Sequence, residues 1–345
     1  MTIAAQSQFA TVAHNRPSGG PYRLCYELHG EGPNKVLLVM GLSGSLRMWD
    51  TTVRQLLARG GFEVCIFDNR DAGDSDKPGP GYSIQDMALD ALELLHHLNW
   101  TRNVFVAGIS MGGMITQELL LAAPEGTFAS AVLISTHAGL TVPPLATIAV
   151  FSKLILWPWG RTETDIIEGF CKLVFHPSWL DGEAPVDSGY TTNREMMQQQ
   201  LLRVGRQKGP QPDHSRRGQI WAVQRHYVSP ARLRRIAQLQ IPVLVMTGTD
   251  DLLIRPSNSH HLAHHLSCPL KEFPSAGHGL PQERPHQVHS LMVETFRKSA
   301  AYMSHTSTGG KLVAGEGHGR VEVNEEEVRR RVREADASVA SAATL

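Results

Sequence analysis

The chain has 345 residues, 41% of them hydrophobic, and its 33 basic residues balance its 33 acidic residues at a formal net charge of zero. This length allows one large domain or two ordinary ones, and it buries enough apolar surface to fold without disulfides or a structural metal. The balanced charge argues against a nucleic-acid-binding protein. The four cysteines are far apart and form no CxxC pair, so we expect no zinc site and a reducing, cytoplasmic location.

Neither end of the chain predicts targeting or membrane insertion. Residues 1–20 lack the basic and apolar regions of a secretory signal, and we expect a flexible leader there. The most apolar stretch, 140–159, contains three prolines and a lysine and is not a clean span of about 20 apolar residues. It favours a buried or substrate-facing helix over a transmembrane one.

Short apolar runs alternate with helical patterns along the first half of the chain and return near its end. The runs are residues 35–40, 64–67, 103–107, 131–134, 243–246 and 271–273. They lack alternation of polar and apolar residues, as is typical of strands buried on both faces of a parallel sheet. Helices are predicted at 84–98, with Ser83 as its N-cap, and at 114–123. The order predicts an α/β fold with a doubly wound, mostly parallel sheet, formed by residues 21–137 and 228–300.

The alternation is interrupted once and then ends. Residues 138–227 have helical character, with tryptophans and a glutamine-rich stretch, and we interpret them as a helical cap inserted over the carboxyl ends of the strands, where ligands bind in such folds. Residues 301–345 are rich in glycine and in runs of opposite charge. We expect a polar, mostly disordered tail there.

A G-x-S-x-G motif lies between an apolar strand and a helix. It consists of Gly108, Ser110 and Gly112 with the two residues between them. In a nucleophile elbow the sharp strand-to-helix turn exposes the serine hydroxyl, and small residues on either side prevent a clash. The motif therefore predicts Ser110 as a nucleophile. The alternative is an ordinary glycine-rich turn whose serine only caps the helix.

A serine nucleophile needs a base and an orienting carboxylate, which follow it in the chain order Ser, Asp or Glu, His. Two adjacent carboxylates, Asp250 and Asp251, follow the strand at 243–246. Asp251 is the preferred candidate, and Asp250 could instead stabilise the turn. His278 lies between two glycines after the strand at 271–273, and is the predicted base. The histidines at 260–265 indicate a solvated helix face, and no metal site is predicted.

Acyl transfer also needs hydrogen-bond donors for the developing oxyanion. The backbone N–H of Met111, after the nucleophile, is one candidate. The other is the N–H of Leu42 in the loop that follows the strand at 35–40, where Gly41 allows a tight turn. Candidate residues for a hydrophobic substrate pocket are Phe151, Trp157, Trp159 and Leu280.

Together these segments resemble the α/β-hydrolase fold superfamily, in its cap-bearing serine esterase branch. The resemblance covers about residues 22–300 and rests on five blocks, at 41–45, 67–78, 108–112, 248–251 and 277–278. Carboxylesterases and methyl esterases of the aclacinomycin methylesterase kind are the most similar members. Two departures concern the loops: Met40 stands where many relatives have histidine, and Asp71 stands where they usually have glycine. Epoxide hydrolases and haloalkane dehalogenases of this fold use an aspartate nucleophile, so Ser110 counts against both.

The residues and the resemblance together predict a serine hydrolase that cleaves carboxylic esters of a small or medium hydrophobic substrate through an acyl-enzyme. It would need no cofactor and no nucleic-acid partner. The alternatives are other triad chemistry (lactone, thioester or C–C bond hydrolysis, or acyl transfer) and a non-catalytic protein that binds a small ligand. The sequence predicts no oligomeric state.

Overall fold

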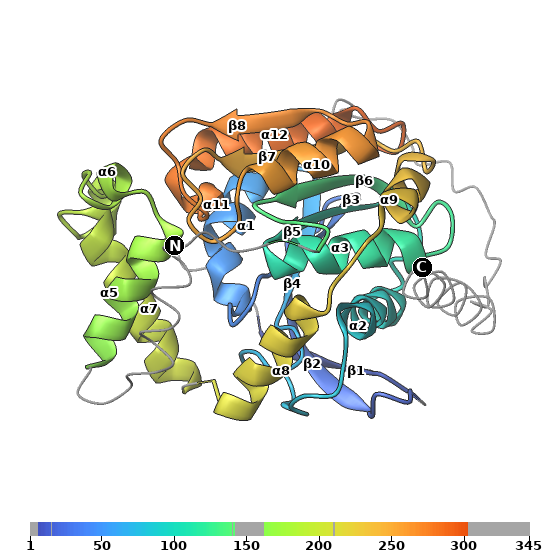
Figure 1. Cartoon of the computed structure of the whole chain (residues 1–345), viewed down its shortest axis with the longest axis horizontal. Helices are drawn as coiled ribbons and strands as arrows, with labels where there is room; N and C mark the ends of the chain where they lie inside the picture. Colours follow the sequence, from blue (N-terminus) through green and yellow to red (C-terminus); the bar gives the residue numbers. More distant parts are fainter. Residues whose placement is uncertain (1–5, 15, 140, 142–161, 210, 303–345) are drawn as a thin grey trace.

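The eight strands that the structure describes form a single sheet in the order β1-β2-β4-β3-β5-β6-β7-β8 (Figure 1). The computed structural model describes residues 6–14, 16–139, 141, 162–209 and 211–302. The strands are β1 (Gln8–Val12), β2 (Tyr22–His29), β3 (Asn34–Val39), β4 (Phe62–Phe67), β5 (Val104–Ile109), β6 (Phe128–Ile134), β7 (Val243–Gly248) and β8 (Leu270–Phe273). From β4 to β8 all neighbours are parallel, while β2 pairs antiparallel with β1 and β4. The predicted doubly wound, mostly parallel sheet is confirmed.

The six predicted strands are the parallel ones, and every residue of β5, β6 and β7 is buried. The prediction of a flexible leader is wrong for residues 8–12, which form the edge strand β1. Beyond β1, the backbone N–H of Ala13 donates to Glu93, and Arg16 donates to Asp90, both on α2 (Ile84–His97). A strand so short gives little periodic signal, and side chains far along the chain hold the segment in place.

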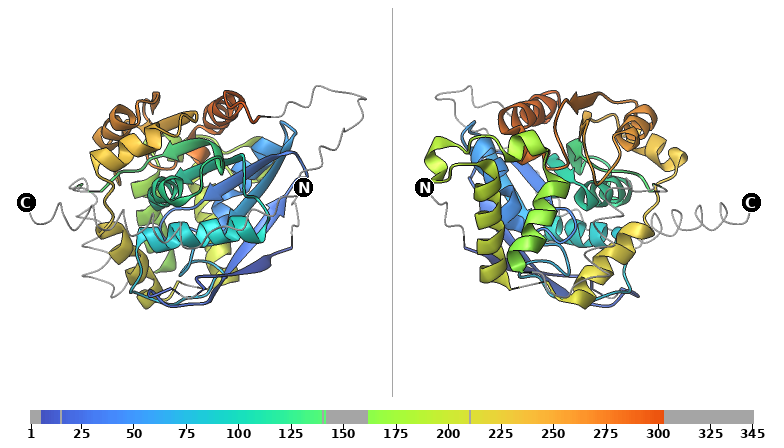
Figure 2. Two further views of the ribbon diagram at one scale, coloured as in Figure 1. Left: turned by 90° about the vertical axis from the view of Figure 1, so that its right-hand side faces the viewer. Right: turned by 60° about the vertical axis from the view of Figure 1, so that its left-hand side comes forward.

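Helices cover both sides of the twisted sheet (Figures 1 and 2). One side carries α2, α3 (Met111–Ala122), α9 (Pro230–Ala237) and α10 (Ser257–Leu266). The other carries α1 (Asp50–Leu57), α11 (Leu280–Glu283) and α12 (Pro285–Arg297). Ser83 caps α2 as predicted, in a capping box with Asp86. Two large apolar clusters, one on each side of the sheet, form the core.

In the described part of residues 138–227, where the sequence predicts a cap, the structure has four α-helices. They are α5 (Glu163–Val174), α6 (Pro177–Leu180), α7 (Asn193–Lys208) and α8 (Asp213–Gln224), and we call them the helical insertion. Helices α5, α6 and α7 stand apart from the two helical layers of the sheet (Figures 1 and 2). The insertion leaves and rejoins the core at one point, where Val228 N–H donates to the Ala138 carbonyl at 2.7 Å. Its function as a cap stays a prediction. Each helix in the described ranges is too short or too polar to cross a membrane.

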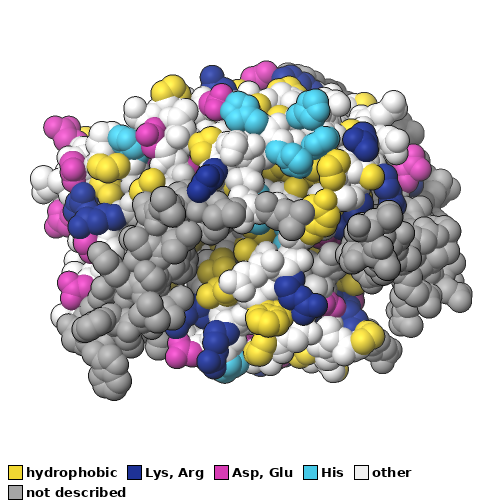
Figure 3. All heavy atoms as spheres, in the orientation of Figure 1, with side chains coloured by type: hydrophobic (Ala, Val, Ile, Leu, Met, Phe, Trp, Pro, Cys, Tyr) yellow, Lys and Arg dark blue, Asp and Glu magenta, His cyan; other side chains and the backbone are white. Residues whose placement is uncertain are grey.

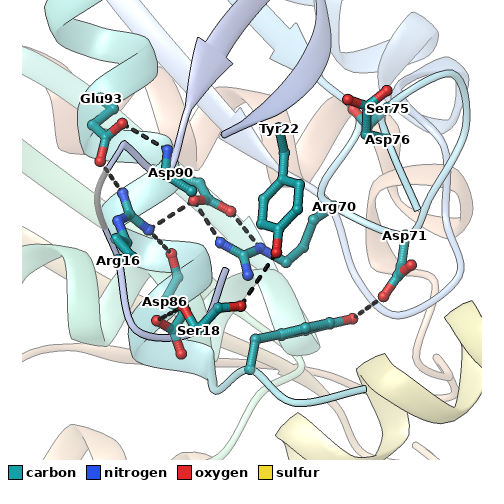
Figure 4. Close-up of polar contacts among 12 residues, drawn as sticks. Arg16, Ser18, Tyr22, Arg70, Asp71, Ser75, Asp76, Asp86, Asp90 and Glu93 are labelled. Atoms are coloured by element: carbon teal, nitrogen blue, oxygen red, sulfur yellow. Dashed lines mark hydrogen bonds and ion pairs between the residues drawn. The ribbon is translucent and has the colours of Figure 1, made fainter. Parts of the chain in front are cut away.

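A buried ion pair connects the turn after β4 to α2. The Arg70 guanidinium makes two hydrogen bonds, of 2.6 and 2.7 Å, to the Asp90 carboxylate. Arg16 donates to the same carboxylate, and Figure 4 shows both arginines directed at it. The rings of Tyr22 and Tyr82 lie 5.0 and 4.9 Å from the Arg70 guanidinium carbon, within cation–π range. These contacts fix the turn at residues 70–71 against the core.

Replacing Asp90 by alanine should destabilise the fold strongly, because Arg70 would be left with an unpaired charge in a buried site and Arg16 would lose one of its two acidic partners, keeping Glu93. We expect a loss of about 3–5 kcal/mol in the free energy of unfolding. Urea denaturation measures it. As a control, Glu294→Ala removes one partner of an exposed pair with Lys298 and should cost less than about 1 kcal/mol. Equal losses in the two variants would contradict a structural role for the buried pair.

Candidate active site

Ser110 occupies the turn between β5 and α3 in a strained conformation. Its φ and ψ angles are 56° and −123°, outside the regions that residues with a side chain ordinarily adopt. Its side chain makes no capping hydrogen bond to the helix. A Cβ on Gly108 would lie 2.3 Å from the Gly112 carbonyl oxygen, and one on Gly112 would lie 2.0 Å from the Val39 carbonyl oxygen. The geometry is that of a nucleophile elbow and differs from the alternative of a helix-capping serine.

The structure brings Asp251 and His278 together. The His278 Nδ1–H donates to Asp251 Oδ2 at 2.8 Å, and both side chains are buried. The other carboxylate oxygen, Oδ1, accepts the N–H groups of Leu253 and Ile254 at 2.8 and 2.9 Å. In the neutral imidazole, a proton on Nδ1 directed at this carboxylate leaves the lone pair on Nε2. Asp250 is exposed and accepts only the Thr249 hydroxyl among the contacts of its side chain in the described residues.

The loops that follow β6, β7 and β8 contact one another around Asp251 and His278. A Cβ on Gly248, at the end of β7, would lie 2.2 Å from the Ala276 carbonyl oxygen, so this position requires glycine. The N–H of Asp250 donates to the same carbonyl at 3.0 Å. The hydroxyl of Ser135, which follows β6, donates to the His278 carbonyl at 3.0 Å. The backbone around His278 is therefore fixed by both neighbouring strands.

The predicted oxyanion loop lies beside the serine. A Cβ on Gly41 would be 3.1 Å from the Ser110 Cβ, which shows how closely the two backbones approach. Met111 is the first residue of α3, where the N–H groups have no partner within the helix. Gly41 therefore lies against Ser110, Met111 follows it at the start of α3, and Leu42 follows Gly41 in the chain. Their action on an oxyanion stays a prediction.

The two departures from the superfamily pattern are compensated locally. The Met40 carbonyl accepts the side-chain amide of Asn69 at 2.9 Å, which anchors the loop in the absence of a histidine. Asp71 has a φ of 68°, in the left-handed region that favours glycine. Its carboxylate accepts the Tyr82 hydroxyl at 2.7 Å and the Gly79 N–H at 3.0 Å. Asp71 therefore keeps the turn that a glycine would make.

Two buried histidines beside the site were missed by the sequence reasoning. Burial and the charge of His278 lower the pKa of His137 to about 4. Burial, with the charges of His137 and Arg232, lowers the pKa of His226 to about 3. The Gly139 N–H donates to His137 Nδ1 at 2.8 Å, so the neutral ring carries its proton on Nε2. Both imidazoles are neutral at pH 7 and add no positive charge near His278. The position of His137 after β6, at a carboxyl strand end, is the signal that could have found it.

Gln219 of α8 is a further residue that the sequence did not reveal. Its side chain is fully buried; Oε1 accepts the N–H of Ser43 at 2.8 Å, and Nε2 donates to the Arg70 carbonyl at 2.9 Å. Ser43 directly follows Leu42, so a residue of the helical insertion holds the predicted oxyanion loop.

Gln219→Ala should reduce catalysis of any acyl substrate by about tenfold, because the loop beside Ser110 would shift slightly. The effect should appear in kcat more than in KM. Gln224→Ala, at an exposed position of the same helix, is the matched control and should leave both constants unchanged. A loss of the same size in the control would show that α8 as a whole, and not this amide, matters.

The remaining predicted residues differ in outcome. Phe151, Trp157 and Trp159 lie outside the described residues. Leu280 is fully buried and packs in the core cluster on the α12 side of the sheet, and its role in a pocket stays a prediction.

Within the described residues, the group with metal-ligand spacing is Cys25, Asp68 and Asp74. Asp68 there accepts the N–H groups of Leu46 and Asp74, which indicates a structural role. Histidine side chains gather on the surface over α10 (Figure 3).

The fold and these loops are those of the α/β-hydrolase superfamily. The model of the serine aminopeptidase S33 family matches residues 31–285. The chain belongs to this family.

Individual relatives and structures are consistent with that membership. The chain is 24% identical over 272 residues to the RutD protein of Acinetobacter baylyi, whose name assigns it to carbamate hydrolysis, and covers 96% of it. With the RutD protein of Azorhizobium caulinodans it shares 36% identity over 107 residues, 31% of this chain. That match spans about two fifths of the relative's length, 39%. The solved structure of a hydrolase from Pseudomonas aeruginosa is 25% identical, with a TM-score of 0.66, and covers 86% of this chain and all of that one.

Proposed function

We propose that the protein is a serine hydrolase that cleaves carboxylic esters through an acyl-enzyme intermediate. The observation that carries the proposal is the Asp251–His278 hydrogen bond at the same sheet edge as the strained Ser110. The carboxylate favours the tautomer in which His278 Nε2 accepts a proton, which a general base for a serine requires. The membership in a family of serine hydrolases supports the same chemistry.

The proposed reaction runs in two halves. The Ser110 oxygen attacks the ester carbonyl carbon while its proton passes to His278 Nε2, and the N–H groups of Leu42 and Met111 bind the oxyanion. The carbon–oxygen bond to the alcohol then breaks, and His278 returns the proton to the leaving alkoxide. In the second half, water attacks the acyl-enzyme, His278 takes its proton, and the Ser110 oxygen leaves with that proton as the acid is released. Each half restores the neutral imidazole.

The substrate class is a separate part of the proposal. We infer a small or medium hydrophobic acyl or alcohol group, because the stretch at 140–159 is apolar and precedes the helical insertion. The names of the RutD relatives add carbamates as a second acyl class. The same triad would also serve lactone, thioester or C–C bond hydrolysis or transfer to an alcohol, and a ligand-binding protein without catalysis is the contrasting alternative.

Labelling with a fluorophosphonate, followed by mass-spectrometric mapping, tests the nucleophile. We expect the label on Ser110. A panel of p-nitrophenyl esters graded in acyl length, together with a carbamate and a lactone, then maps the substrate class, and added alcohol separates hydrolysis from transfer. No label on Ser110 together with no turnover of any acyl substrate would overturn the proposal, and tight binding of a small ligand would then favour the contrasting alternative.

A further inference from the structure

The carboxyl group of Glu283 connects the loop of His278 to the helical insertion. Glu283 ends α11 and is 4% exposed. Its Oε1 accepts the N–H of Gly277 at 2.9 Å and the N–H of His176 at 3.3 Å. Gly277 immediately precedes His278, and His176 is the N-cap of α6. A single oxygen atom thus bridges the loop of the proposed base and the insertion.

A second set of contacts closes the same junction. The N–H of Gly279, on the other side of His278, donates to the Val174 carbonyl at 2.9 Å. A Cβ on Gly277 would lie 2.8 Å from that same carbonyl oxygen, and one on Gly279 would lie 2.3 Å from the ring of Phe175. Residues 174–176 of the insertion therefore contact the residues on both sides of His278, and both glycines are needed for the approach.

The second oxygen of the carboxyl group, Oε2, is buried and has no hydrogen-bond partner within the described residues. Burial raises the pKa of Glu283 to about 7, and the charge of Asp251 acts in the same direction. The two backbone N–H groups and the charge of Arg284 oppose this rise. Within the described residues, Asp251 and Arg284 are the groups whose charges act on this carboxyl, and the imidazole of His176 is hydrogen-bonded to Ser178. A buried carboxyl with one oxygen that has no hydrogen-bond partner within the described residues costs stability.

We propose that Glu283 is a positioning residue that couples the seating of the helical insertion to the orientation of His278. The coupling rests on the proposed function, in which His278 is the general base. With the bridge in place, residues 174–176 and the His278 loop move as one unit. Without it, the N–H groups of Gly277 and His176 lose their shared acceptor, and the imidazole can turn away from Ser110 although its bond to Asp251 remains possible.

Three variants test the coupling by structure and by rate. Glu283→Ala removes the bridge, and Glu283→Gln keeps an acceptor oxygen in its place. Glu294→Gln, in an exposed pair on α12, is the control. In the Ala variant we expect hydrogen exchange in residues 174–178 and 274–279 to accelerate together by about tenfold. We express kcat per molecule that the fluorophosphonate labels at Ser110 and measure it well below the unfolding temperature. This kcat should fall by about 10–100-fold with little change in KM. The Gln variant, whose neutral amide oxygen accepts the two N–H groups less strongly than a carboxylate does, should lie between the Ala variant and the wild type in both measurements.

The pH profile separates positioning from plain structural support. The ionised carboxylate holds the two N–H groups more strongly than the neutral acid does, so the bridge weakens as the pH falls through about 7. Wild-type kcat should therefore decline below pH 7 more steeply than one ionisation allows. In the Glu283→Gln variant residue 283 cannot ionise, so the pH dependence of kcat should be that of a single titrating group.

The coupling can be tested even if the Ala variant fails to fold, because the pH dependence of kcat is measured in the Gln variant. Exchange that rises in only one of the two segments, or a normalised kcat equal to that of Glu294→Gln, would overturn the coupling. If the wild type neither labels at Ser110 nor turns over any ester, the proposed function has failed. The exchange of the two segments still supports or overturns the bridge in that case.

Discussion

Replacement of Ser110 by alanine is expected to lower ester hydrolysis by at least about 10³-fold, to a rate set only by binding and the oxyanion donors. The variant should fold normally. The Ser110 side chain makes no capping bond in α3, and alanine removes a single oxygen atom from a half-buried position. The measurement is kcat/KM on the most rapidly cleaved ester of the panel, together with the thermal unfolding midpoint of each protein.

The control for this prediction is Ser290→Ala, on the exposed side of α12, which should hydrolyse like the wild type. Fluorophosphonate labelling should disappear in the Ser110 variant and persist in the control. Hydrolysis that survives in a folded, unlabelled Ser110 variant would remove the serine mechanism, whatever the substrate.

The sequence predicts the parallel part of the fold and all three residues that the structure brings to one sheet edge. Ser110 and Asp251 follow strong apolar runs, His278 follows the short strand β8, and the carboxyl ends of parallel strands meet at one edge. The antiparallel strands β1 and β2 escape this reasoning. In β2 the apolar pattern is broken by Glu27 and His29, which are buried as a pair and would be taken for surface residues.

Residues that act through the backbone are also beyond what a single sequence predicts. Gln219 binds the N–H of Ser43, 176 positions away, and Glu283 binds the N–H of His176, 107 positions away. A backbone partner leaves no residue type that a motif could reveal. The sequence alone also does not decide which of Asp250 and Asp251 contacts His278. Both residues follow the same strand, and only the direction of each side chain distinguishes them.

The second large effect is expected for Asp251→Asn, with a loss of about 10³–10⁴-fold in kcat and little loss of stability. The asparagine oxygen can still accept the N–H groups of Leu253 and Ile254, which now bind Oδ1. Its NH₂ group, however, would face Nδ1 of His278, where the carboxylate oxygen now accepts a proton. A donor there favours the tautomer with the proton on Nε2, and that nitrogen can then no longer take the proton of Ser110.

Asp250→Asn is the matched control, since it makes the same chemical change one residue earlier on an exposed side chain. Its only side-chain contact within the described residues is the Thr249 hydroxyl, so we expect wild-type rates. The two variants make the same chemical change in the same loop and differ in the burial and the contacts of the substituted side chain. A comparable loss in both would mean that the loop, and not the hydrogen bond to His278, controls the rate. Full activity in Asp251→Asn would show that another group orients the imidazole.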